Sequence, residues 1–212
     1  IVIVGHSDHG KSTLVGRLLH DTGMLPAGKF EELKAINKQS GVPIAWPAAA
    51  DMAQDERDPT VPAELTQVHI TSAKRTYTVI DAASQHTFLR SMIGGAVQAE
   101  AAVIVVDVAQ GASDQTRRHA YLLHLLGVPK VIVAVNKMDT VDFNQAAFER
   151  VQGEMLIYLE DLGLRVSDII PIDARHGDNL IAASADLPWW KGATLVETLR
   201  SEEHTSELQS RG

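Results

Sequence analysis

Short apolar runs alternate with amphipathic stretches along the chain, and this pattern predicts buried strands joined by helices. The strand signals are β-branched runs without charge, whereas the helical signals are apolar residues recurring every three to four positions. Strands are expected at Ile1–Val4, Gln67–Thr71, Tyr77–Ile80, Ala101–Asp107, Val131–Val135 and Ile169–Ile172. Helices are expected at Lys11–His20, Lys29–Lys38, Phe88–Gln98, Ser113–Leu126, Asn144–Leu162 and from Thr194 onward. This alternation indicates an α/β fold with a mostly parallel sheet and helices on both faces.

A glycine-rich loop lies between the first strand and the first helix. Its sequence, Gly-His-Ser-Asp-His-Gly-Lys-Ser, matches the phosphate-binding pattern G-x-x-x-x-G-K-[S/T] in the strand–loop–helix context that the pattern requires. Such a loop turns backbone N–H groups inward around an anion, and the helix N-terminus adds partial positive charge. The sequence therefore predicts a nucleoside triphosphate site. Its expected contacts are Gly5, His6, Ser7, Asp8, His9, Gly10, Lys11, Ser12 and Thr13.

A second motif, Asn136-Lys137-Met138-Asp139, follows a buried strand and predicts which base is bound. The Asp139 carboxylate can accept paired hydrogen bonds from N1–H and the exocyclic amine of guanine. Adenine would leave this carboxylate desolvated and unpaired. Asn136 can tie the motif to the phosphate loop, and the Lys137 stem and Met138 complete the base-binding segment. Alone the motif could be a solvated turn, but behind a phosphate loop it predicts GTP or GDP rather than ATP.

Composition limits the number of domains and the classes of partner. The 212 residues suffice for one well-filled domain, and the net charge of −8 disfavours a broad nucleic-acid surface. There is no cysteine, which excludes disulfides and thiol chemistry, and no apolar run long enough to span a bilayer. A cytoplasmic protein is expected. Because the chain starts inside a strand and residues 200–212 read as an adapter-encoded tail, we expect one domain over residues 1–199, truncated at both ends.

These motifs resemble those of one GTPase family. The chain resembles a translational-type GTPase domain, of the elongation factor Tu and 1-alpha kind, and is most similar to the GTP-binding large subunit of bacterial ATP sulfurylase (sulfate adenylyltransferase). Beyond the two motifs above, the resemblance rests on Gly16–Gly23, Gln115–His119, Val141–Phe143, His176–Asn179 and Leu187–Trp190. It implies a P-loop NTPase G domain that couples GTP hydrolysis to adenylylsulfate formation in sulfate assimilation. It also implies a partner catalytic subunit of ATP sulfurylase and C-terminal β-barrel domains. Neither a nucleic acid nor a membrane is expected as a partner.

The resemblance also implies roles for individual residues. Ser12 and Asp81 would hold Mg²⁺, Lys11 and Gln85 would be the catalytic groups, and the N–H of Ser84 would meet the γ-phosphate. The N–H of Ala174 would meet the guanine oxygen, and Arg175 follows it in the same loop. Together with the phosphate loop and Asn136–Asp139, these complete the expected GTP, GDP and Mg²⁺ contacts.

Both switch segments depart from the family pattern. The magnesium-binding threonine of the first switch is replaced by Pro62, with Thr60 as a possible substitute two residues away. In the second switch Ser84 replaces a glycine and Gln85 replaces the water-positioning histidine, a role that glutamine fills in other GTPases. Asp173 stands where the guanine-supporting loop usually has serine. We therefore expect nucleotide binding with weak hydrolysis.

Two alternatives remain open at this stage. The altered switches fit a pseudo-GTPase that binds nucleotide only to shape a protein interface. A translation elongation factor GTPase is the other alternative, which the acidic charge and the Gly177–Asn179 stretch disfavour.

Overall fold

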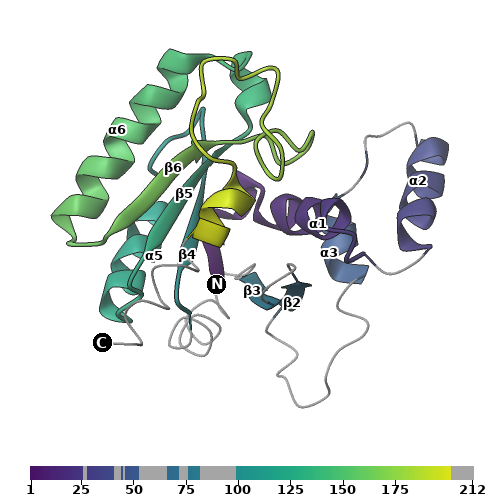
Figure 1. Ribbon diagram of the computed structural model, residues 1–212, viewed down its shortest axis with the longest axis horizontal. Helices are drawn as coiled ribbons and strands as arrows, with labels where there is room; N and C mark the ends of the chain where they lie inside the picture. Colours follow the sequence, from purple (N-terminus) through teal and green to yellow (C-terminus); the bar gives the residue numbers. More distant parts are fainter. Residues whose placement is uncertain are drawn as a thin grey trace.

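The computed structural model describes residues 1–25, 28–40, 44, 46–52, 66–71, 76–81 and 99–201. Its strands form one six-stranded sheet in the order β2-β3-β1-β4-β5-β6 (Figure 1). β2 pairs with β3 antiparallel, and the other neighbouring strands pair parallel. The bounds are β1 Val2–Gly5, β2 Thr66–Thr71, β3 Thr76–Asp81, β4 Ala102–Asp107, β5 Val131–Asn136 and β6 Val166–Pro171. The expected α/β fold with a mostly parallel sheet is confirmed.

The helices agree with the sequence pattern except at one place. They are α1 Lys11–Asp21, α2 Lys29–Ser40, α3 Trp46–Met52, α5 Asp114–Leu125, α6 Gln145–Asp161, the 3₁₀ turns Ser7–His9 and Met138–Val141, and a last helix over residues 195–201. The helix expected at Phe88–Gln98 lies outside the described residues. α3 was not expected, because prolines surround it. Pro47 is tolerated since it lies in the first turn, where its missing N–H has no helical partner, and the alanines that follow favour helix.

Polar side chains fix where α5 and α6 begin. Ser113 accepts a hydrogen bond from the N–H of Thr116 at 3.1 Å, as the sequence predicts for a helix cap. Asn144 does the same for the N–H of Ala147 at 3.0 Å. Both helices end in tight turns that contain a glycine with positive φ, Gly127 at 70° and Gly163 at 71°. These turns lead into the amino ends of β5 and β6.

Alternate strand residues pack on opposite faces of the sheet. Val2 and Val4 face a core formed with α5 and α6, whereas Ile3 faces a core formed with α1 and the last helix. All three side chains are at most 1% exposed. The first core also contains Ala102, Ile104, Val133, Leu123, Phe148, Val151 and Met155. The second also contains Val103, Val105, Ile132, Leu14, Leu18, Leu195 and Leu199. Helices therefore cover both faces, as expected.

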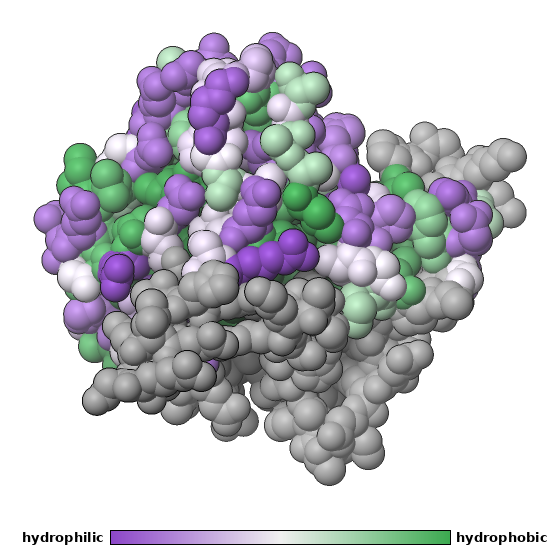
Figure 2. Space-filling view, in the orientation of Figure 1, coloured by the Kyte–Doolittle hydropathy of each residue, from purple (hydrophilic) through white to green (hydrophobic). Residues whose placement is uncertain are grey.

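The outer surface is mixed in character. Figure 2 shows hydrophilic and hydrophobic residues interspersed over the described part of one face. Among the described residues, the exposed large apolar side chains are Met24, Tyr121, Leu125, Leu156 and Ile157. Of the helices in the described ranges, none has the length and apolar character needed to cross a membrane.

The carboxyl ends of the parallel strands meet at one edge of the sheet. β1 ends at Gly5, next to the ends of β3 and β4, and β4 ends level with β5 because Asp107 is in register with Asn136. On the other side, Ile3 is in register with Asp81. Ligands of such sheets bind beyond the carboxyl ends of the strands. Both sequence motifs leave the sheet at this edge.

Candidate nucleotide-binding site

Two glycines allow the phosphate loop to lie close to its neighbours. Gly5 has φ 149° and Gly10 has φ 89°. A Cβ atom on Gly5 would collide with the carbonyl oxygen of Val105, and one on Gly10 would come within 2.5 Å of Nδ2 of Asn136. The backbone of the loop therefore packs directly against β4 and against the base-reading segment Asn136–Asp139. A side chain at either glycine would not fit.

Lys11 lies folded back over the loop. Its side chain is buried, and Nζ donates hydrogen bonds to the carbonyl oxygens of Gly5 and His6, both at 3.0 Å. The ammonium is thus held among the backbone groups that the motif predicts around the phosphates. Ser12 and Thr13 follow in the first turn of α1, and Ser7 and Asp8 lie exposed in the preceding 3₁₀ turn.

Two buried histidines near the loop, His9 and His119, have lowered pKa values. His9 is fully buried, with Nδ1 3.2 Å from the carbonyl oxygen of Val105 and Nε2 3.3 Å from Oε1 of Gln110. Burial lowers the pKa of His9. Burial, with the nearby Lys11 charge, lowers the pKa of His119 to about 4. Lys11 therefore supplies the positive charge here, while His9 anchors the loop to β4.

Asn136 joins three segments of the site. Its Nδ2 donates to the carbonyl oxygen of His9 at 2.8 Å, and its Oδ1 accepts from the N–H of Ala174 at 2.9 Å. The side chain is buried, so both bonds are shielded from water. The structure thus forms the expected link between Asn136 and the phosphate loop. It adds a second link, to the loop after β6, that the sequence did not predict.

An ion pair between Lys137 and Asp107 ties the base-reading segment to the end of β4. Lys137 has φ 64°, and its Nζ lies 2.7 Å from Oδ2 of Asp107. The other Asp107 oxygen accepts from the N–H of Ala109 at 2.8 Å, so Asp107 caps the loop after β4. Burial alone would raise the pKa of Asp107, but its hydrogen bonds with Lys137 and Ala109 outweigh burial and hold that pKa low. Met138 is fully buried in the core.

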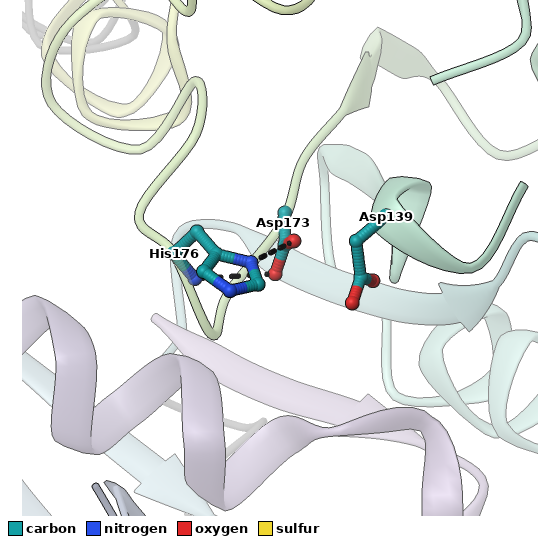
Figure 3. Close-up of side chains that lie close together, drawn as sticks. All are labelled: Asp139, Asp173 and His176. Atoms are coloured by element: carbon teal, nitrogen blue, oxygen red, sulfur yellow. Dashed lines mark hydrogen bonds and ion pairs between the residues drawn. The ribbon is translucent and has the colours of Figure 1, made fainter. Parts of the chain in front are cut away.

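Two carboxylates and an imidazole share the corner where guanine is expected. One ligand atom each of Asp139, Asp173 and His176 lies within 4.8 Å of the others (Figure 3). Burial and the Asp173 charge raise the pKa of Asp139. Oδ2 of Asp173 lies 2.6 Å from Nδ1 of His176, and this hydrogen bond raises the pKa of His176. Asp139 thus lies in a more negative environment than a lone carboxylate.

Asp173 holds the loop that follows β6 in its conformation. Its Oδ1 accepts from the N–H groups of Arg175 at 2.8 Å and His176 at 3.3 Å. Its backbone pairs with Asp178, and the N–H of Gly177 donates to its carbonyl oxygen at 2.8 Å. These bonds define a compact loop over residues 173–178, which we call the guanine loop. The sequence identified the substitution but not the partnership with His176.

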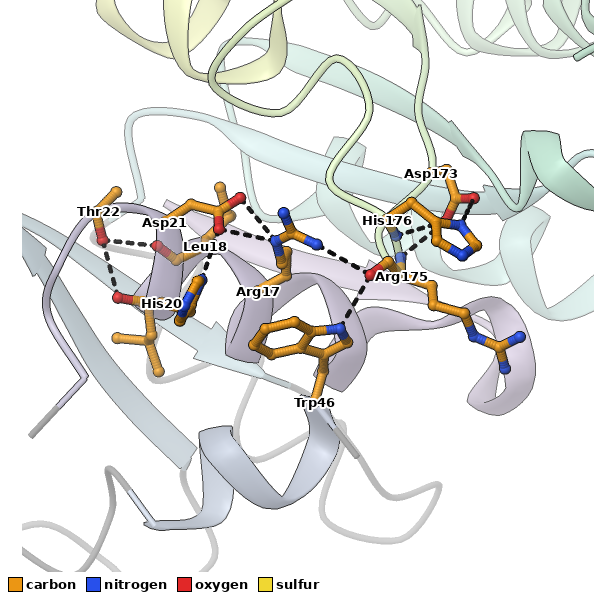
Figure 4. Close-up of polar contacts among 10 residues, drawn as sticks. Arg17, Leu18, His20, Asp21, Thr22, Trp46, Asp173, Arg175 and His176 are labelled. Atoms are coloured by element: carbon orange, nitrogen blue, oxygen red, sulfur yellow. Dashed lines mark hydrogen bonds and ion pairs between the residues drawn. The ribbon is translucent and has the colours of Figure 1, made fainter. Parts of the chain in front are cut away.

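Ala174 and Arg175 make hydrogen bonds within the protein that the sequence did not predict. The N–H of Ala174 already donates to Asn136, so a guanine oxygen would have to share this donor. The Arg175 side chain extends away from the Asp173–His176 pair, whereas its carbonyl oxygen accepts two hydrogen bonds from α1 and α3 (Figure 4). Arg175 therefore contributes to this part of the site through its backbone.

Other expected site residues lie partly or wholly outside the described chain. Thr60, Pro62, Ser84 and Gln85 are outside the described residues. Only the backbone of Asp81 is described; it ends β3 opposite Ile3 of β1, beside the phosphate loop. The two switch segments thus remain sequence-based predictions.

The ion pair of His176 predicts a pH-dependent contribution to stability. Since the folded-state pKa of His176 is raised, its stabilisation is complete below its ordinary pKa of about 6.5 and is lost as the pH rises through the folded value. His176→Gln should therefore lower the free energy of unfolding at about pH 5.5 and change it less at about pH 9. The loss at the lower pH should stay below about 1 kcal/mol, because the imidazole is exposed to solvent although Asp173 is buried. Urea unfolding at both pH values measures the difference. The pH dependence should shrink in an Asp173→Asn background, where the Asp139 and Asp178 charges still raise the pKa of His176, and an undiminished dependence there would contradict the pairing.

Comparison with known proteins agrees with this geometry. Elongation factor 1-alpha of Pyrococcus furiosus is 41% identical over 202 residues, covering 94% of this chain and 46% of the relative. The same protein of Thermococcus gammatolerans gives the same values. The chain thus spans about half the length of these curated relatives. They are named elongation factor 1-alpha and not ATP sulfurylase, so they do not support the narrower assignment made from the sequence.

Solved structures agree on the fold. The crystal structure of Sup35 complexed with GDP has a TM-score of 0.65 at 24% identity, covering 93% of this chain and 43% of that chain. Sup35 complexed with GMPPNP has a TM-score of 0.63 with the same coverage. The family model described as elongation factor Tu GTP binding domain matches residues 1–203. The chain therefore belongs to the elongation factor Tu GTP-binding domain family.

Proposed function

We propose that this domain binds GTP and GDP, with the phosphates on the loop Gly5–Ser12 and the guanine read by Asp139. The observation that carries the proposal is the position of Asn136, whose one side chain joins the phosphate loop, the base-reading segment and the guanine loop. A site for both ends of one nucleotide needs this kind of rigid connection. Membership of a GTP-binding domain family supports it.

Mg²⁺ is proposed to bind between Ser12 and Asp81. The donor set fits, because a hydroxyl and a carboxylate are oxygen ligands of the kind that Mg²⁺ prefers. The placement fits as well, since Ser12 lies in the first turn of α1 and the end of β3 runs beside β1. When bound, the ion would neutralise charge on the phosphates, while Lys11 holds its ammonium beside them.

Hydrolysis is proposed to be slow. Pro62 offers neither a hydroxyl nor an N–H, and Ser84 restricts a backbone position that is normally glycine. Gln85 can orient a water, as glutamine does in other GTPases, so the chemistry is reduced rather than abolished. In a pseudo-GTPase, by contrast, the nucleotide would be retained without turnover.

The larger protein is proposed to be a translation-factor-type GTPase. The support is the 41% identity to elongation factor 1-alpha. Identification as the sulfate adenylyltransferase subunit has weaker support. The stretches that favoured it, His176–Asn179 and Leu187–Trp190, make contacts within the domain. Asn179 bonds to the carbonyl of Pro171, and Nε1 of Trp189 to that of Phe143. Residues committed to internal contacts say little about which partner is bound.

Nucleotide binding and turnover test the proposal on one sample. The chain is expected to bind GDP and GTP at least about 100-fold more tightly than ATP, since a desolvated carboxylate rejects adenine. Calorimetry with the three nucleotides measures this preference. Single-turnover cleavage of GTP with Mg²⁺ should then be slow. Equal binding of ATP would overturn the assignment of Asp139, and cleavage at an ordinary GTPase rate would overturn the argument from the switches.

Partner binding separates the two protein contexts. The full-length protein containing this domain should bind ribosomes in a GTP-dependent manner if it is a translation factor. Stable co-purification with an ATP sulfurylase catalytic subunit, without ribosome binding, would favour the sulfate-activating context instead.

A further inference from the structure

The carbonyl oxygen of Arg175 is a shared acceptor between the guanine loop and two helices distant in sequence. Nη1 of Arg17 in α1 donates to it at 3.0 Å, and Nε1 of Trp46 in α3 donates to it at 3.0 Å (Figure 4). These donors lie 158 and 129 residues away along the chain. These bonds hold the guanine loop in addition to the bond from the N–H of Ala174 to Asn136.

Arg17 is itself fixed in place. Its Nε lies 2.8 Å from each carboxylate oxygen of Asp21, one helical turn later. Its guanidinium carbon lies 5.1 Å from the ring centroid of Trp46, within the range of a cation–π contact. Gly177 lies directly against the guanidinium, because a Cβ atom there would collide with it. The guanine loop thus has a glycine where Arg17 needs room.

Trp46 is also fixed in place by its neighbours. Its side chain is buried, and its ring centroid lies 5.1 Å from that of His20 and 6.2 Å from that of Phe30. α3 can approach α1 this closely because residue 16 is glycine, since a Cβ atom on Gly16 would collide with the carbonyl oxygen of Trp46. Both donors are therefore held in position by contacts within the protein.

We propose that Arg17 and Trp46 are positioning residues of the guanine site, which act through the Arg175 carbonyl to set the position of the guanine loop. This rests on the proposed function, because the guanine loop is expected to contact the base. Arg175 directly follows Ala174, so a shift of its carbonyl moves the N–H expected near guanine O6. Each donor acts through its bond to the loop.

The same bonds couple the guanine loop to α3. α3 ends at Met52, on the amino-terminal side of the first-switch residues Thr60 and Pro62 in the sequence. Because coupling free energies are reciprocal, a base that orders the guanine loop also stabilises the position of α3. Guanine binding and the position of α3 are thus linked without a shared ligand.

Two conservative variants of the 212-residue chain test the proposal. Trp46→Phe keeps an aromatic ring and removes the N–H donor, and Arg17→Lys keeps the charge but loses the planar fork that serves Asp21 and Arg175 together. Each should release GDP about 3- to 10-fold faster, the effect of one lost hydrogen bond on loop position. Displacement of a fluorescent GDP analogue measures the release rate. The control Tyr158→Phe removes one hydrogen bond from an aromatic side chain to the carbonyl of Arg117 and should leave release unchanged.

A base analogue distinguishes loop position from general damage. Inosine diphosphate keeps O6 but lacks the 2-amino group, so a shifted guanine loop should weaken GDP and inosine diphosphate by the same factor. A displaced Asp139 would weaken GDP more. GDP should also shift the NMR resonance of the Trp46 indole N–H in the wild-type protein. This measurement does not depend on whether either variant folds.

The outcomes separate this proposal from the proposed function. Absence of GDP binding by the wild-type chain contradicts the proposed function. Normal GDP binding, with wild-type release rates in both variants or an unmoved Trp46 resonance, overturns the positioning role alone. Faster release in both variants, with equal weakening of the two nucleotides and an unchanged control, supports it.

Discussion

Asn136→Ala is expected to weaken GDP binding by roughly 100-fold or more and to destabilise the fold by about 2–4 kcal/mol. The substitution removes the hydrogen bonds to His9 and Ala174 together. It leaves the carbonyl of one and the N–H of the other without their partner, and a buried unsatisfied group costs about 1–3 kcal/mol. The direct link between the phosphate loop and the guanine loop would then be lost. Calorimetry with GDP and urea unfolding measure the two effects.

A matched substitution controls for general destabilisation. Asn144→Ala removes the cap of α6, which should cost about 1 kcal/mol of stability and leave GDP affinity unchanged, because the cap lies outside the site. Equal losses of GDP affinity in Asn136→Ala and Asn144→Ala would show that the effect comes from stability and not from joining the loops.

Asp139→Asn is expected to reverse the base preference. The carboxylate accepts two donors from guanine, and charge-assisted hydrogen bonds are worth about 1.5–3 kcal/mol each, so GDP affinity should fall roughly 100-fold or more. An amide can accept from N1–H and donate to the C2 oxygen of xanthine, so xanthosine diphosphate should bind the variant better than GDP does. Competition between the two nucleotides measures the ratio.

The control for this variant lies three residues further along. Asp142→Asn makes the same chemical change at an exposed position with φ 51°, a conformation that asparagine tolerates well. Its GDP affinity should match that of the wild type. A continued preference for GDP in Asp139→Asn would mean that another group reads the base.

The sequence predicted those parts of the site whose chemistry is local. The phosphate loop is one continuous segment between a strand and a helix, so its glycine spacing reports its geometry directly. Asn136 and Asp139 follow a buried strand, which places them at the same edge of the sheet. Periodicity located the strands well because β-branched runs such as residues 131–135 occur where both faces of the sheet are covered.

The contacts that depend on distant segments were not predictable. Trp46 lies in a proline-rich stretch without periodicity, and its bond to Arg175 spans 129 residues. The amide of Asn136 was expected to bind the phosphate loop, but its second bond to Ala174 depends on how the loop after β6 folds. The partnership of Asp173 with His176 was missed for a different reason. An i,i+3 pair of this kind in a loop has no periodic signal.

The glycine turns at the opposite edge of the sheet have a practical consequence for engineering. Gly127 and Gly163 connect helices to the amino ends of β5 and β6, and an added Cβ atom at either would meet no neighbour within 4 Å. A fluorescent protein or a purification handle inserted at one of these turns would sit across the sheet from the nucleotide. The two turns are therefore natural attachment points for converting this domain into a guanine-nucleotide biosensor.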